Sequence, residues 1–405
     1  MNKAYLLLIV LFLIYIGTGS GISLLGSAWP AISLDILAPL TWQSILLVII
    51  YLSATAGAAC AQRLLAWFRD MIPSALGILM LVISIFGFAA TYSFYVIAAL
   101  SVLLGFSLGL SGAIVNGYVT RHYATTWMSW LHCCFAVGCM IGPAVISYFI
   151  INVNSWRMGY QAVGFVELGI LVVLIASFSL WRVHGPAFAF PRIRRKDAET
   201  AASHSGSKVV TLRILAGMPG GMLIPVIIFF HASFEVSIFS WSTTFMTEER
   251  GLTPGAAAGI MAVFYGAQLG GRVISGLVTI KVRDRIVLNT ALVAALAATI
   301  LFLIAPDNLL TFAFIVLGVV TGPLFPLFVH DVPSIVGDEK AQGAIGIQIA
   351  AANLGNTFIP LLIGVVAGIA GFRVFPVFLL ILVGLSLSLK IAQNRIVRKS
   401  GNINV

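Results

Sequence analysis

Two ionisable side chains lie inside a strongly apolar segment of the chain, residues 215–246. Glu235 is an acid in this segment, and His231 precedes it by four residues, which places both on one face of a helix. An unpaired carboxylate is costly inside a membrane, so such a residue marks an ion path or a substrate site. Burial favours the neutral acid, whereas a nearby imidazolium favours the carboxylate. The pair is therefore predicted to couple to protons; the alternative for both residues is a role in packing.

Five side-chain amides are candidates for binding a small polar solute. Recognition needs a few polar groups that face a cavity with apolar walls, and amides both donate to and accept from hydroxyl groups. Gln348 and Asn353 are turned about 140° from each other on a helix, whereas Gln348 and Asn356 lie nearer one stripe. For each amide the alternative is a hydrogen bond between helices. The candidates are Asn116, Gln268, Gln348, Asn353 and Asn356.

Other residues leave two interpretations open. Trp29 and Trp241 can stack on the apolar face of a sugar, but they come near expected outer ends of helices, where tryptophan anchors a protein at the membrane interface. Glu167 is a second acid in an apolar run, and it has two alternative roles: helix packing or the binding of a proton. His330 and Asp331 close another run, where we expect them to be solvated and to cap a helix.

Twelve apolar runs must position these residues. The composition is 60% hydrophobic and 9% charged, the mean hydropathy is +1.06, and a run of about 20 apolar residues crosses the hydrocarbon core of a bilayer. The sequence therefore predicts an all-α membrane protein with twelve transmembrane helices. The predicted spans are 4–31, 41–63, 73–91, 95–119, 128–151, 158–181, 215–246, 254–279, 286–305, 308–330, 341–369 and 374–393.

The basic residues predict how these spans are oriented. With a cytosolic N-terminus, all but three of the 23 Lys and Arg residues fall at or near the cytosolic face; Arg157, Arg250 and Arg373 lie opposite. This is the positive-inside pattern, so both termini are predicted to be cytosolic, and we expect the bacterial cytoplasmic membrane. The apolar start resembles a signal peptide, but a retained first helix keeps the number of spans even. The net charge of +10 is expected to interact with anionic lipid and not with nucleic acid, because no soluble region is long enough to form a DNA-binding domain.

A hydrophilic stretch divides the spans into six plus six. It contains two prolines and a basic run and is too polar to bury a core, so it is predicted to be a cytosolic linker. Trp29 and Trp241, and Arg69 and Arg283, recur at nearly equal separations in the two halves. A repeated six-span unit is the layout of two-domain secondary transporters. The predicted domains are residues 1–181, the linker 182–213 and residues 214–405.

Several chemistries are excluded because their motifs are missing from the sequence. The chain lacks a Walker A pattern, so uphill work must use an ion or exchange gradient. It has no His-Glu-x-x-His zinc motif, no paired intramembrane aspartates and no Gly-x-Ser-x-Gly elbow, so we do not expect an enzyme. Cys133 and Cys134 point about 100° apart on a helix and lack a second ligand pair. No metal or cofactor is therefore expected.

Four motifs of the C-terminal part support a family resemblance. They are SFEVSIFSW at 233–241, GGRVISG at 270–276, GPLFP at 322–326 and GIQIAAANLG at 346–355. They resemble the seventh, eighth, tenth and eleventh helices of major facilitator superfamily transporters, most of all the branch of fucose/galactose/glucose:proton symporters and related sugar or drug carriers. In the N-terminal half the agreement lies mainly in the layout of the spans.

The resemblance also implies a cytosolic gate, with one departure. The superfamily's loop motif would place an aspartate near Ala66 and Ile280, and both positions are apolar. The charge network that latches the gate is therefore expected to differ in this chain. The gating candidates are Arg272, Gly276, Arg283, Asp284, Arg69 and Asp70.

Taken together, the residues and the resemblance predict a secondary active transporter that works by alternating access. A sugar or sugar-like metabolite is favoured as substrate, because amide candidates outnumber charged ones, and protons are the expected coupling ion. The alternatives are a proton-antiport exporter of drugs or metabolites and a non-transporting membrane sensor on a transporter fold. Besides the solute and protons, the lipid bilayer is the expected partner. We expect a monomer, because a chain with two halves can enclose its own pathway.

Overall fold

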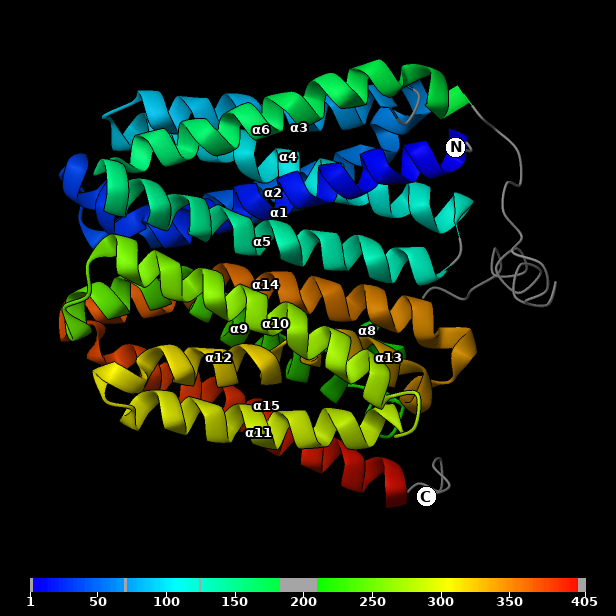
Figure 1. Cartoon of the computed structure of the whole chain (residues 1–405). Coiled ribbons are helices and arrows are strands. Elements are labelled where there is room, and N and C mark those ends of the chain that lie inside the picture. The colour runs from blue at the N-terminus through cyan, green and yellow to red at the C-terminus, as the bar shows by residue number, and fades with distance from the viewer. Residues whose placement is uncertain (1–2, 69–70, 124, 183–209, 400–405) are drawn as a thin grey trace. The chain divides into compact units, whose positions relative to one another are not determined.

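A computed structural model describes residues 3–68, 71–123, 125–182 and 210–399. Over these residues the chain is built from helices (Figure 1), and twelve helical segments are long and apolar enough to cross a membrane. The predicted all-α architecture with twelve spans is therefore confirmed. Most of the predicted linker 182–213 lies outside the described residues.

Contacts between residues divide the chain into two compact units. Helices α9 (Leu223–Arg250), α10 (Pro254–Val278) and α14 (Asp338–Ala370) contribute residues to both. The division into halves at 1–181 and 214–405 stays a prediction. Unit 1 comprises residues 1–188, 239–269 and 360–375, and unit 2 comprises residues 189–238, 270–359 and 376–405.

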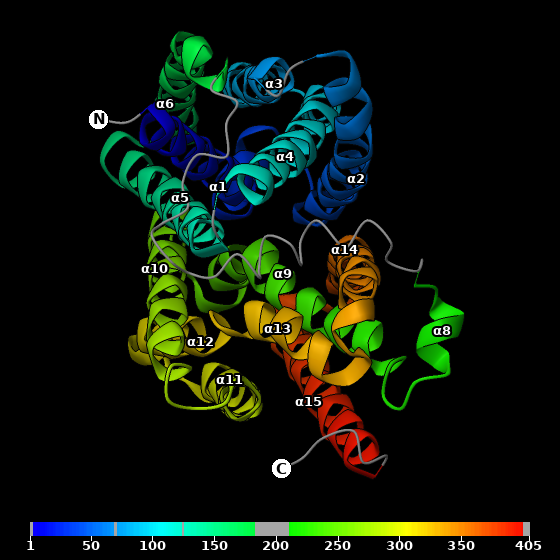
Figure 2. The same ribbon diagram turned by 90° about the vertical axis from the view of Figure 1, so that its right-hand side faces the viewer.

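Six long helices form most of unit 1. Helix α1 packs along α5, α2 along α4, and α3 against both α4 and α6 (Figure 2). Leucine, isoleucine and aromatic side chains fill the core between them. The helices are α1 (Lys3–Asp35), α2 (Gln43–Trp67), α3 (Met71–Ala90), α4 (Phe94–His122), α5 (Thr125–Val153) and α6 (Trp156–Ala176), with short 3-10 turns at Leu40–Trp42, Ser177–Arg182 and Phe372–Val374.

Glycines allow the backbones of α1 and α5 to approach closely. A Cβ atom at Gly19 of α1 would lie against the carbonyl oxygen of Phe135. A Cβ atom at Gly138 of α5 would lie against the carbonyl oxygen of Ile16. Small residues at such positions are how transmembrane helices gain packing contacts, since lipid supplies no hydrophobic drive between them.

The seventh span begins later than predicted from hydropathy. The predicted span 215–246 starts in a short separate helix, α8 (Leu212–Ala216), whereas α9 begins at Leu223. Gly220 lies between them with φ +74°, a left-handed conformation that glycine adopts without steric cost. Gln393 holds this turn, because its Nε2 donates to the Gly220 carbonyl oxygen at 3.0 Å.

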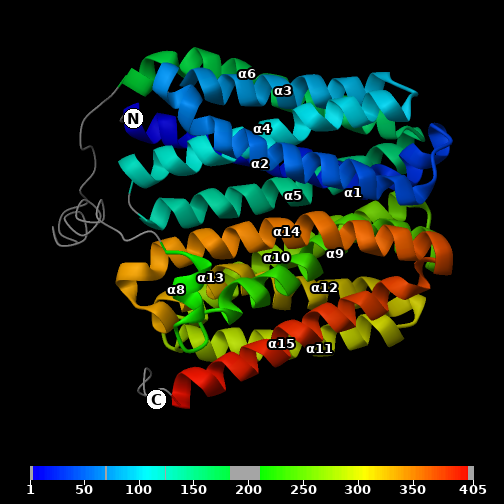
Figure 3. The same cartoon turned by 180° about the vertical axis from the view of Figure 1, so that it is seen from behind.

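The tenth span is broken near its middle, between α12 and α13 (Figure 3). Pro323 precedes the first residue of α13 and has no N–H to continue the hydrogen-bond ladder of α12. The break divides the span into two shorter helices. The helices of unit 2 not yet described are α11 (Asp284–Ile304), α12 (Leu310–Thr321), α13 (Leu324–Val336) and α15 (Phe375–Lys399).

The packing of α1 on α5 predicts that Gly138→Ala destabilises the protein. The added methyl group must displace the backbone of α1 at Ile16, and overpacking of this kind costs about 1–3 kcal/mol. Thermal unfolding of the purified protein in detergent measures the loss.

Gly169→Ala on α6 is the matched control, because nothing lies within 4 Å of a Cβ atom at that position. This variant should unfold at the wild-type temperature. Equal losses in the two variants would contradict the close contact between α1 and α5.

Candidate functional site

The break in the tenth span leaves a backbone carbonyl group without its helical partner. In an α-helix this carbonyl accepts from the N–H four residues later. The residue four after Gly322 is Pro326, which has no N–H. Arg272 of α10 replaces the missing donor, since its Nε donates to the Gly322 oxygen at 3.0 Å. Inside a membrane every backbone polar group must be satisfied within the protein, and this bond satisfies the carbonyl group that the break leaves unpaired.

Gly271 brings α10 close to the same break. A Cβ atom at Gly271 would lie against the carbonyl oxygen of Val319. That carbonyl also lacks its helical donor, because the residue four later is Pro323. The pair Gly271 and Arg272 therefore faces both carbonyl groups that the two prolines leave unpaired.

Glu235 of α9 is the second charged residue at this place. Its Oε1 lies 3.9 Å from Nη2 of Arg272, and the two side chains are 11% and 22% exposed. Glu235 is close to the midpoint of α9, and Gly322 is close to the midpoint of the tenth span. The guanidinium group of Arg272 thus reaches well inside the membrane span, although the sequence places this residue near the cytosolic face. Its role in gating stays a prediction.

His231 lies one turn before Glu235 but makes no hydrogen bond to it. The imidazole ring is fully buried against Phe328, with ring centroids 4.9 Å apart, and neither nitrogen has a hydrogen-bond partner among the described residues. Gln348 of α14 reaches the same residue, since its Nε2 donates to the Phe328 oxygen at 3.3 Å. The structure thus brings His231 and Gln348 together at Phe328. The joint role of His231 and Glu235 in holding a proton stays a prediction.

The five amide candidates differ in their surroundings. Asn116 and Asn356 are half-buried, and each has a side-chain oxygen that is buried without a hydrogen-bond partner among the described residues. Gln348 is buried and has such an oxygen too, Gln268 is buried, and Asn353 is exposed. Folded proteins rarely leave buried polar atoms unpaired. In unit 2 the oxygens of Gln348 and Asn356 are therefore acceptors that a polar molecule can satisfy, and in unit 1 the same holds for the oxygen of Asn116.

The two candidate tryptophans are part of the core of unit 1. Both side chains are fully buried, so neither ring is exposed at a membrane interface or in a cavity of this structure. The indole Nε1 of Trp29 donates to the Leu40 oxygen at 2.7 Å, and that of Trp241 donates to the Pro360 oxygen at 3.1 Å. Their role in substrate binding stays a prediction.

Of the remaining gating candidates, Gly276 is in the last turns of α10, Arg283 and Asp284 are at the start of α11, and two lie outside the described residues. Gly276 and Arg283 are exposed. Asp284 is in the first turn of α11, where a negative charge is favoured by the helix dipole. Arg69 and Asp70 lie outside the described residues. The gating role of all five stays a prediction.

The expectation of a solvated Asp331 is wrong, although His330 is exposed. Asp331 is only 6% exposed and forms an ion pair with Lys390 of α15, which is 1% exposed. The Nζ of Lys390 also donates to Oε1 of Gln393 at 2.7 Å. Helix α15 continues to Lys399, so Lys390 lies within the last span and neutralises Asp331 there.

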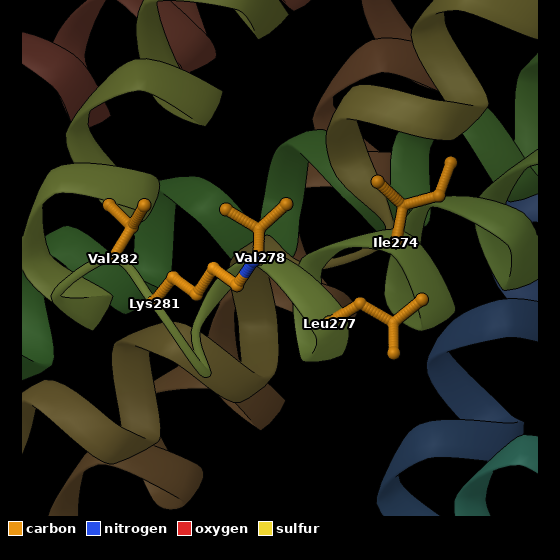
Figure 4. A pocket seen from close by; sticks show the side chains of 5 residues that line it. All are labelled: Ile274, Leu277, Val278, Lys281 and Val282. Carbon is orange, nitrogen blue, oxygen red and sulfur yellow. The ribbon is translucent and has the colours of Figure 1, made fainter.

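A shallow groove of about 360 Å³ lies at the end of α10 (Figure 4). Four of its five lining residues are apolar, and Lys281 is the fifth. Leu277 and Ile274 are more than half exposed. Exposed apolar side chains on a membrane span face lipid, so this groove fits an acyl chain better than a polar solute. Its lining residues are Ile274, Leu277, Val278, Lys281 and Val282.

Comparison with known proteins finds a family match in the C-terminal part of the chain. A family model described as Major Facilitator Superfamily matches residues 223–400, which contain Glu235, Arg272 and the broken span. A D-xylose–proton symporter has the same fold over 96% of this chain and 97% of its own, with a TM-score of 0.73 and 13% identity. The match over residues 223–400 and the shared fold support the resemblance to this superfamily of transporters.

Other solved structures share the fold over nearly the full chain, and one curated protein is similar in sequence. A bacterial homologue of the human lysosomal transporter Spinster, in an inward-facing unoccupied conformation, has a TM-score of 0.72 at 13% identity and 98% coverage of both chains. A nucleoside transporter has a TM-score of 0.72 at 14% identity, covering 98% of this chain and 100% of its own. Bypass of stop codon protein 6 of Saccharomyces cerevisiae is 24% identical over 318 residues, which are 73% of this chain. The match spans 63% of that relative's length.

The structure also buries an acid in unit 1. Glu167 of α6 is fully buried, and its Oε1 is within hydrogen-bond distance of Oγ of Ser20, at 2.9 Å. Its Oε2 has no hydrogen-bond partner among the described residues. Gly17 of α1 makes room for the acid, because a Cβ atom there would collide with the carboxyl oxygens.

The donors and acceptors around Glu167 favour its neutral form. The Ser20 hydroxyl has one hydrogen, yet it lies 2.9 Å from both the Gly17 carbonyl oxygen and Oε1 of Glu167. A neutral acid can donate to Ser20, whose own hydrogen then goes to Gly17. A carboxylate would instead be left with a charged oxygen that has no donor, which is costly in a membrane.

The cap on Gly322 predicts how two substitutions combine. Arg272→Met leaves the Gly322 carbonyl unpaired and should lower the free energy of unfolding by about 1–3 kcal/mol. Adding Pro326→Ala creates an N–H four residues after Gly322, so the double variant should recover part of the loss. Thermal unfolding in detergent reports both effects.

Arg373→Met is the control for the loss of an arginine. Arg373 pairs with Glu249 at 2.9 Å, but its side chain is 87% exposed. Exposed ion pairs contribute less than about 1 kcal/mol. A loss as large as that of Arg272→Met, or no recovery with Pro326→Ala, would rule out the capping role of Arg272.

The hydrogen bonds around Glu167 predict that its carboxyl group is protonated at neutral pH. Infrared spectra of the purified protein should show the C=O stretch of a protonated acid that disappears in Glu167→Gln. Glu249→Gln, which removes a carboxylate paired with an exposed arginine, should leave that band unchanged. Identical spectra for wild type and Glu167→Gln in this region would show that Glu167 is ionised.

Proposed function

We propose that the chain is a secondary active transporter that moves a small polar organic solute by alternating access and couples this movement to protons through Glu235. The observation that carries the proposal is the Glu235–Arg272 pair at the broken tenth span. In transporters, discontinuous helices place charged and unpaired polar groups near the bilayer midplane, where substrate and coupling ion bind. The fold shared with a proton symporter supports the proposal.

Glu235 has the surroundings that a proton carrier needs. Its side chain is 11% exposed, so a proton can reach it, yet most of it is withdrawn from solvent. Its Oε1 lies 3.9 Å from Nη2 of Arg272, so a positive charge lies beside the carboxyl group that would take up and release the proton.

The polar acceptors support a hydroxyl-bearing solute. Within unit 2, Gln348 and Asn356 of α14 each have a buried oxygen that no described residue satisfies. A hydroxyl group of the solute can donate to such an oxygen. A sugar or sugar-like metabolite meets this requirement.

The positive-inside bias supports cytosolic termini. Our proposal of a monomer follows from the two halves, because a chain with two halves can enclose its own pathway. Our expectation for the membrane is the bacterial cytoplasmic membrane, and the yeast relative shows that similar sequences also occur in a eukaryote. In either setting a proton gradient across the membrane can drive the cycle.

Uptake into proteoliposomes tests the proposal. Wild-type protein, given a panel of sugars and metabolites and an imposed proton gradient, should accumulate at least one of them. Glu235→Gln should lower gradient-driven accumulation by about tenfold or more while sparing exchange of solute across the membrane.

Glu248→Gln is the matched control, since Glu248 is an exposed acid at the end of the same helix. It should accumulate solute as the wild type does. Undiminished accumulation by Glu235→Gln would remove Glu235 from the coupling mechanism.

A further inference from the structure

Arg272 has more hydrogen-bond donors than the described residues use. A guanidinium group carries five N–H bonds. Nε donates to the Gly322 oxygen at 3.0 Å, whereas Nη2 is 3.9 Å from the Glu235 oxygen, beyond hydrogen-bond distance. Within the described part of the chain, the N–H groups on Nη1 and Nη2 therefore have no acceptor.

These unused donors lie in an accessible place. Of the Arg272 side chain, 22% is exposed, although the residues it contacts are near the midpoints of their spans. Exposing a guanidinium group to hydrocarbon is very costly, so the space beside it must hold polar matter. Water fills such a space until a ligand with better acceptors replaces it.

We propose that Arg272 binds an oxyanion of the transported solute, a carboxylate or a phosphate, and that the substrate is a small organic anion. The inference rests on the proposed transport function. The planar fork of arginine matches these groups with two parallel hydrogen bonds. Lipid phosphates lie at the bilayer surface and not at the midplane, so the anion belongs to a solute and not to a lipid headgroup.

Glu235 sets the protonation state in which the anion binds. As a carboxylate it balances the charge of Arg272 and repels a second anion. When it takes up a proton, the charge of Arg272 is left unbalanced, and the substrate oxyanion restores neutrality. One proton and one anion thus enter the site together without changing its net charge.

Other titratable groups near the pair are few. His231 is on the same helix as Glu235, one turn earlier, with both nitrogens unpaired among the described residues. On α13, His330 is exposed and Asp331 is already paired with Lys390. Helix α14 has no charged residue after Lys340. The pH dependence of anion binding is therefore assigned to Glu235.

Thermal stabilisation of the purified full chain by matched probes tests this assignment. The probes are gluconate against glucose and galacturonate against galactose, with acetate and inorganic phosphate alone, at acidic and neutral pH. The organic acids should raise the unfolding temperature more than the neutral sugars, and more so at acidic pH. No stabilisation by any anion, or equal stabilisation by acids and sugars, overturns the proposal.

Two variants separate the roles of the charges. Glu235→Gln removes the repelling charge without removing Arg272, so it should tighten binding of the acids by about tenfold and abolish the pH dependence. Arg272→Lys keeps the charge but loses the fork, so it should weaken binding by about tenfold. Arg398→Met, which removes an exposed arginine of α15, should bind as wild type. Weaker acid binding by Glu235→Gln overturns the proposal, even if the Arg272 variant fails to fold.

The binding assay needs no proton gradient, so its result on the anion site does not depend on whether the proposed transport function is right. Tight acid binding combined with undiminished accumulation by Glu235→Gln would leave the anion site standing and remove proton coupling. Gradient-driven accumulation of a neutral sugar, without stabilisation by any acid, would support the proposed transport function and overturn the anion site.

Discussion

A membrane offers no water to an unpaired carbonyl group, and this constraint accounts for most of the polar chemistry in unit 2. Pro323 and Pro326 remove two N–H groups from the tenth span, so the carbonyl groups of Val319 and Gly322 need other partners. Arg272 of helix α10 donates to the Gly322 carbonyl, and Gly271 allows the backbone of α10 to approach Val319 closely. The arginine brings a positive charge into the span, and Glu235 lies near enough to balance it. One missing pair of backbone donors thus leads to an intramembrane ion pair.

The number of spans could be read from the sequence because a bilayer sets one length for every helix that crosses it. The start of the seventh span could not be read from the sequence. Hydropathy averages over the glycines before Leu223 as if they continued a helix, whereas Gly220 turns the chain into a left-handed conformation. Averages over 20 residues detect burial in lipid but not a single backbone angle.

The candidate site was partly predictable for a similar reason. Glu235 stands out because it is an acid in an apolar run, which is a property of the local sequence. Arg272 was placed at the cytosolic end by its position in α10, and nothing local shows that its long side chain reaches Gly322, 50 residues away in sequence. The available signal was the spacing of Gly322 and Pro326, which predicts a carbonyl in need of a donor. The burial of Asp331 depends on Lys390, 59 residues away, so no local pattern reveals it.

The ion pair between Asp331 and Lys390 has a consequence for how the chain is made. Ribosomes deliver helices in order, so Asp331 enters the bilayer with α13 well before α15 exists. During that interval the acid has no cation beside it and must be neutral or remain close to water. The last helix then brings Lys390 to Asp331 and Gln393 to the turn at Gly220, at the start of unit 2's first long helix. Completion of this unit is therefore a late event, because a nascent chain that stops short of α15 carries an acid without its cation.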